Sequence, residues 1–148
     1  MDASKISTCT EMFTKNNLGQ VLAILDDIQL KYFDCAWRLL DGLTISSVKD
    51  ELSRSPVTLC AVMGGGDFGV NDESVQEQFR QVGNQIKVAS ALNAKIVRVF
   101  ASLIPAQYAT DETIRRVIAN LRKLTRMAAA AIHVASIQRG SNGTNASE

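Results

Sequence analysis

Short apolar runs alternate along the chain with segments in which apolar residues recur every three or four positions. The short runs are typical of buried β-strands, and the longer repeat is typical of amphipathic helices. The pattern predicts strands at residues 5–10, 32–40, 57–63, within 93–105 and at 132–138. It predicts helices that begin at Asn17, at 46–54, from 71 or 72 to 93, and at 111–130.

Four residues mark the ends of the predicted helices. Asn17 is a favourable N-cap, and Gln20 three residues later completes the pattern of a capping box. Asn93 readily takes the left-handed backbone conformation with which many helices end. Pro56 stops the second helix, because proline cannot continue one.

The order of the elements, in which strands and helices alternate, predicts an α/β fold. Strands separated by helices of this length form a parallel sheet with right-handed crossovers. A five-stranded doubly wound open sheet suits a chain of 148 residues. A (β/α)8 TIM barrel needs about 200 residues, so the chain would form a partial barrel of about five strands and four helices. The pattern alone leaves both architectures open.

Composition is that of an ordinary globular domain and excludes several classes of partner. Hydrophobic residues make up 46% of the chain, charged residues 21%, and the net charge is +1. The basic residues cluster only within the predicted helix 111–130, beside Asp111 and Glu112, as on a solvated face, so no nucleic-acid partner is expected. The longest apolar run, MAAAAIHVASI, is shorter than the roughly 18 residues of a membrane span, so no membrane partner is expected.

The cysteines and the first residues bear on the cellular compartment. Cys9, Cys35 and Cys60 lie far apart, without a CxxC pair, each in a predicted strand. Such a set is typical of buried free thiols in a reducing compartment. The segment MDASKISTCTEMF lacks the basic and apolar regions of a signal peptide. We therefore expect a cytoplasmic protein.

One charged residue interrupts the apolar run IVRVFA at residues 96–101. In a strand Ile96, Arg98 and Phe100 share one face, while Val97, Val99 and Ala101 share the other. In a barrel the second face would pack against helices, and Arg98 would point into the interior. A buried arginine needs a partner, because an unpaired buried charge costs several kcal/mol.

Several stretches together carry a resemblance to a known family. They are ISTCT, YFDCAWRLLDG, VTLCAVMGGGDF and IKVASALNAKIVRVFAS, in this order. Over residues 4–140 the chain resembles the N-terminal portion of the sugar phosphate isomerase/epimerase family, the xylose isomerase-like TIM barrels. The resemblance favours the barrel over the open sheet and leaves 141–148 as a flexible tail.

The resemblance implies a divalent metal, Mn, Mg, Co or Zn, and a sugar or sugar phosphate substrate. In the family a Glu at the end of the fifth strand and an Asp, a His and a Glu from later strands hold the metal. Here Gln138 stands near the first ligand position, and Ala36 replaces the usual Glu of the second strand. Gln138 offers a neutral oxygen without charge. We therefore expect the chain not to bind metal tightly.

The expected carboxyl ends of the strands supply the candidate site residues. Glu11 and Arg98 are candidate catalytic residues. Trp37, Arg38 and the loop residues Gly65, Gly66 and Asp67 are candidates for substrate binding, because an aromatic ring stacks on sugars and successive glycines expose N–H groups to phosphate. For each candidate a structural role is the alternative.

Two functions fit these observations. The first is a truncated or N-terminal part of a divalent-metal-dependent sugar (phosphate) isomerase/epimerase, inactive alone. The second is a non-catalytic half-barrel that assembles with itself or another chain through open sheet edges. The related endonuclease barrels that act on abasic DNA are disfavoured, since they need several histidines and the chain has one.

Overall fold

The computed structural model describes residues 6–141, of which the side chains of Asp72 and of residues 131–141 are not described. The strands are β1 (Ser7–Cys9), β2 (Tyr32–Ala36), β3 (Thr58–Met63) and β4 (Ile96–Arg98). The α-helices are α1 (Leu18–Asp27), α2 (Ile45–Ser53), α3 (Asp72–Ala91) and α4 (Asp111–Ser141). Short 3-10 helices are η2 (Thr10–Met12), η3 (Trp37–Leu39) and η4 (Ala106–Tyr108).

The four strands form one parallel sheet in the order β1-β2-β3-β4. A helix follows every strand, so the described residues contain four consecutive βα units. The register is regular except for a shift between Phe33 and Asp34, where β2 meets β3. This repeat is the partial (β/α)8 architecture that the sequence predicted. Within the described residues β1 and β4 are edge strands.

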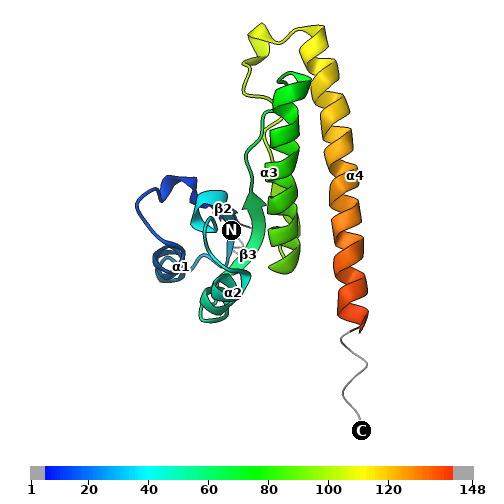
Figure 1. The fold of residues 1–148 in the computed structure, drawn as a ribbon. Coiled ribbons are helices and arrows are strands. Elements are labelled where there is room, and N and C mark those ends of the chain that lie inside the picture. Colours follow the sequence, from blue (N-terminus) through cyan, green and yellow to red (C-terminus); the bar gives the residue numbers. More distant parts are fainter. Residues whose placement is uncertain (1–5, 142–148) are drawn as a thin grey trace.

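Alternation along the strands separates a helix-facing side from a concave side. Phe33, Cys35 and Val62 lie in a buried core with α1 and α2. A second core, which includes Phe68 and Phe79, lies under α3 and α4. Val97 packs against both cores. Asp34, Met63 and Arg98 alternate with these residues and lie on the opposite side. Figure 1 shows α3 and α4 side by side at one flank of the sheet, away from α1.

The predicted helix ends are largely confirmed. The Asn17 side chain accepts from Gln20 N, and the Gln20 side chain accepts from Asn17 N, which completes the capping box. Asn93 has a φ of 61°, the left-handed conformation expected after α3. The second helix begins one residue earlier than predicted, because the Thr44 hydroxyl accepts from Ser47 N and caps it. These signals are local, so the sequence reveals them.

The predicted strand at 132–138 is wrong, because α4 continues through these residues to Ser141. The segment between Asp111 and Arg139 contains neither glycine nor proline, and it passes through four consecutive alanines. Extending an existing helix costs little per residue, and alanine has the highest helix propensity. The assignment of Gln138 to a metal-ligand position assumed a strand end that is absent here. The Gln138 side chain lies outside the described part, as does the predicted tail at 141–148 except for the backbone of Ser141, which ends α4.

Within residues 6–141 no helix combines the length and the apolar character that a membrane span requires.

Candidate functional site

The concave side of the sheet carries a row of polar and sulfur-containing side chains, one or more from each strand. Arg98 Nη1 lies 3.4 Å from Asp34 Oδ2 and 3.8 Å from Met63 Sδ. The Ser7 hydroxyl donates to Asp34 Oδ1 at 2.8 Å, and Cys9 Sγ lies 3.1 Å from Met63 Sδ. We call these five residues the concave row. It joins β1, β2, β3 and β4 across the face that becomes the interior of a closed barrel.

Arg98 has the acidic partner that the sequence requires, though not on the adjacent strand. The partner is Asp34 on β2, and Met63 on β3 lies between the two. The Asp34 side chain is 19% exposed and that of Arg98 is 53% exposed. Arg98 is therefore paired but retains donor groups on the open side of the sheet. Asp34 was missed as a site residue, although it interrupts the apolar run YFDCA just as Arg98 interrupts IVRVFA.

Trp37 and Arg38 follow β2 in η3 and hold the chain after β1. Arg38 Nη2 donates to the carbonyl oxygens of Thr10, at 3.4 Å, and of Phe13. The buried Thr10 hydroxyl accepts from Ala36 N and donates to Asp34 O. Trp37 is half-buried against the core of α1 and α2. Both candidates therefore have structural contacts, and substrate binding by either stays a prediction.

Glu11 lies in η2, directly after β1, and its side chain is exposed. It follows the concave row in the chain, since Cys9 precedes it by two residues. A catalytic role for Glu11 also stays a prediction.

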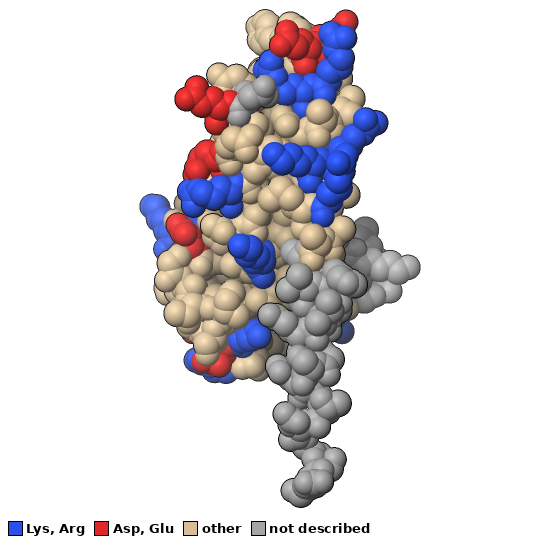
Figure 2. Space-filling model, turned by 45° about the vertical axis from the view of Figure 1, so that its right-hand side comes forward, with Lys and Arg blue, Asp and Glu red and all other residues tan. Residues whose placement is uncertain are grey.

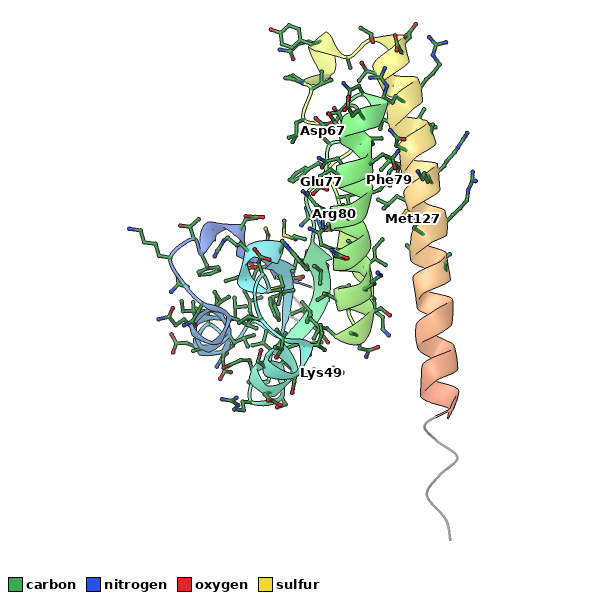
Figure 3. All side chains as sticks on the ribbon, viewed as in Figure 1. Lys49, Asp67, Glu77, Phe79, Arg80 and Met127 are labelled. Atoms are coloured by element: carbon green, nitrogen blue, oxygen red, sulfur yellow. The ribbon has the colours of Figure 1, made fainter. Side chains whose placement is uncertain are left out.

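The loop after β3 is anchored to its surroundings. Asp67 Oδ1 accepts from Gly69 N and from the Ser102 hydroxyl, each at 3.0 Å, and Asp67 N donates to Gln78 Oε1 at 3.1 Å. Figure 3 shows Asp67 near the beginning of α3. The carboxylate joins this loop to the one between β4 and α4. These contacts give Asp67 a structural role, and substrate binding by Gly65, Gly66 and Asp67 stays a prediction.

Backbone hydrogen bonds determine which N–H groups of the loop after β3 remain available to a ligand. Gly64 N donates to Arg98 O, and Phe68 N donates to Ala101 O. Gly65 and Gly66 make no backbone N–H bond among the described residues. A phosphate at this loop would thus find two N–H groups, and the Asp67 carboxylate nearby would oppose it.

Gln85 on α3 is a further polar group near the loop that the sequence did not indicate. It is 4% exposed, and its Oε1 has no hydrogen-bond partner within the described residues. The side chain lies against Gly64, where an added Cβ would be 2.1 Å from Gln85 Oε1. A side chain at position 64 would therefore force the buried Gln85 side chain to move. Gln85 occupies an otherwise apolar helix face, and nothing in its spacing distinguishes it from a surface glutamine.

The described residues do not fit a metal centre. Among them no three His, Cys, Asp or Glu side chains come together. The Asp34 carboxylate already accepts from Ser7 and pairs with Arg98, which leaves it a poor ligand for a hard cation. A metal bound at the Asp34 carboxylate would have to compete with Arg98.

The three cysteines are free, but only Cys35 is buried. Burial raises the pKa of the Cys35 thiol to about 12, and nearby Arg38 lowers it slightly. Cys9 and Cys60 are half-buried, so the sequence expectation of three buried thiols is wrong for these two.

Similarity to known proteins is found at the level of structure. No protein-family model matches the sequence, and no curated protein matches it. L-ribulose 3-epimerase matches with a TM-score of 0.69 and 17% identity over 86% of this chain and 46% of its own. The 3-keto-D-glucoside 4-epimerase of E. coli matches with a TM-score of 0.67 and 19% identity over 86% and 52%. The IolI protein, solved with a zinc atom, matches with a TM-score of 0.68 and 14% identity over 86% and 49%.

The described fold therefore matches part of the xylose isomerase-like TIM barrel. The chain spans about half the length of the three structural neighbours named above. This agrees with the resemblance to an N-terminal portion seen in the sequence.

Proposed function

We propose that the chain is the N-terminal portion of a divalent-metal-dependent sugar or sugar phosphate isomerase/epimerase and is inactive alone. The concave row is the observation that carries this proposal. In a barrel the concave side faces the interior, and Asp34 and Arg98 present an acceptor and donors there. Sugar epimerases among the structural neighbours support the substrate class.

The chemistry explains why the chain needs more residues than the described ones. Isomerisation or epimerisation moves a proton or hydride next to a carbonyl, and a divalent cation supplies the polarisation of the sugar oxygens. The described residues bring no group of three suitable ligands together. In this proposal Asp34 accepts from a sugar hydroxyl and Arg98 donates to a sugar oxygen or phosphate, so these residues orient the substrate.

The test is a titration of the ¹⁵N-labelled chain with D-psicose, L-ribulose and fructose 6-phosphate. We expect amide shifts in β2 and β4 that are lost in Arg98→Met. The matched control is Arg54→Met, since Arg54 is an exposed arginine at the end of α2. Shifts that survive Arg98→Met, or none with any sugar, would contradict sugar binding by the concave row.

A turnover assay tests the predicted inactivity separately. With the same sugars and Mn²⁺, Mg²⁺ or Co²⁺, we expect no product from the isolated chain. Clear turnover would show that the chain has a complete site.

The two open sheet edges favour a second function, a half-barrel module that works by assembly. Unpaired N–H and C=O groups of an edge strand readily accept another strand. In the described residues β1 and β4 are such edges, and both are parallel to the rest of the sheet. The module would assemble with itself or with another chain.

A further inference from the structure

Exposed apolar side chains concentrate on the two flanks of the sheet. Twelve large hydrophobic side chains are exposed among the described residues. Eleven of these lie in the first βα unit, between residues 6 and 28, or in the last, between 96 and 118. Leu43 is the exception, and the third unit has none. The flanks therefore have the composition of surfaces that another polypeptide covers.

A groove lies beside the open edge of β4. It has a volume of about 370 Å³ and an apolar lining from three elements. These are α3 with Val82 and Ile86, β4 with Val97, and α4 with Leu121 and Leu124. In a closed barrel the next strand lies beside β4 and beneath α4. The groove thus has the position that a fifth strand would occupy.

The strand β1 has the pattern required of that fifth strand. The Ser7 hydroxyl contacts Asp34, which places Ser7 on the concave side. Ile6 and Thr8 alternate with it and belong to the side that faces helices. Ile6 is 40% exposed, and Thr8 is half-buried. Placed beside β4 of another copy, Ile6 and Thr8 would enter the groove beneath its α4.

The face of α4 that points away from α3 is apolar and basic. Met127 contacts Gly83 on α3 and defines the near side, as Figure 3 shows. Residues of a helix follow each other at about 100°, which places another set on the far side. That set is Ile114, Ile118, Arg115, Arg122 and Arg126, all of them exposed, and Asp111 is the one acidic residue beside them at the start of the helix. Figure 2 shows Lys and Arg side chains gathered on this part of the molecule.

The free face of α1 is apolar and acidic. Gly19 and Asp26 line a hollow toward α2 and define the near side of α1. Ile24, Asp27 and Ile28 lie on the side away from α2, and all three are exposed. The helix has no basic residue. In apolar character and in charge this face complements the far side of α4.

We propose that the partner of this half-barrel is a second copy of the same chain, and that two copies form a closed eight-stranded barrel. This inference names the partner for the second function proposed above and does not depend on sugar binding. The β4 strand of each copy pairs with β1 of the other, so a two-fold axis along the barrel satisfies all four edges at once. Each α4 then packs against α1 of the other copy. Two concave rows face each other inside.

The first test is the mass of the chain in solution by sedimentation and light scattering. We expect a dimer that Ile6→Asp weakens by about tenfold or more, because two symmetric charges enter two apolar grooves. Leu43→Asp is the matched control, since Leu43 is 47% exposed but lies outside both flanks. Circular dichroism checks that both variants are folded. A monomeric chain, or equal weakening by the two variants, would overturn the proposal.

The second test reverses charges across the α1–α4 contact. Asp27→Arg alone and Arg122→Glu with Arg126→Glu should each weaken the dimer, and all three changes together should restore it. Asp26→Arg is the control, because Asp26 faces α2. A dimer without this rescue uses another interface and contradicts the closed barrel. These readouts are masses, so they fail or succeed independently of the sugar titration.

Discussion

At the scale of residues, Arg98 and Asp34 give the concave side of an otherwise apolar sheet its polarity. Each is a single charged residue in a core-type strand, and they are 64 positions apart in the chain. The pair remains partly solvated because the barrel is open on that side. Because water partly solvates both charges, neither pays the full desolvation cost of a buried charge. The exposed part of Arg98 also remains able to contact a ligand.

The strength of this pair can be measured with Asp34→Asn, Arg98→Met and the double variant. We expect a coupling of about 0.5–1 kcal/mol, because Arg98 is half-exposed and solvent screens the interaction. Urea unfolding of the four proteins gives the free energies. Strictly additive effects would show that the pair contributes nothing to the folded state.

The lowered pKa of Glu77 predicts that the stability of the fold decreases at low pH. Hydrogen bonds from Arg80 and then Gln81 lower its pKa from 4.5 to about 2. A lowered pKa stabilises the fold above pH 4.5, and this stabilisation is lost as the pH falls toward 2. Carboxyl NMR titration should therefore give a midpoint near 2 that rises toward 4.5 in Arg80→Gln. An unchanged midpoint in this variant would contradict the role of Arg80.

At the scale of elements, the sequence reveals what local chemistry determines. Asn17, Gln20 and Asn93 act within one turn of backbone, and each was predicted with its conformation. The partner of Arg98 was not, because it depends on which strands the register brings together. The incorrectly predicted strand at 132–138 also depends on residues outside the segment itself. Its β-branched residues are typical of a strand, but nothing in the chain interrupts α4 before them.

The joint between β3, β4 and α3 depends on the absence of a side chain at Gly64. In Gly64→Ala the Cβ would lie 2.1 Å from Gln85 Oε1 and 3.2 Å from Arg98 O. We expect a loss of about 1–3 kcal/mol in unfolding free energy, because a buried joint tolerates overpacking poorly. The matched control is Gly65→Ala, where an added Cβ meets nothing within 4 Å. The double variant Gly64→Ala with Gln85→Ala should recover part of the lost unfolding free energy. Equal losses in Gly64→Ala and Gly65→Ala would contradict this account.

At the scale of the whole molecule, the described half-barrel carries the concave row but no group of three metal-ligating side chains. The metal ligands that the resemblance implies belong to the end of a fifth strand and to later strands, whereas the described residues form four strands. Removing or adding metal therefore tests whether this chain contributes a metal site of its own. A chain that only orients substrate should be indifferent to metal.

We expect the thermal midpoint of the chain to respond little to Mn²⁺, Mg²⁺ or Co²⁺. A metal held more weakly than about 1 mM and supplied at about 1 mM stabilises the folded state by less than about 0.4 kcal/mol, or about 2 °C for a chain of this length. The comparison is the same protein in excess chelator, measured by calorimetry. A rise of about 10 °C would require a tight site. Asp34 is already engaged by Ser7 and Arg98, so such a site would draw its ligands from outside the described side chains. The variant Gln138→Ala would then show whether Gln138, predicted near a metal-ligand position, contributes to metal binding.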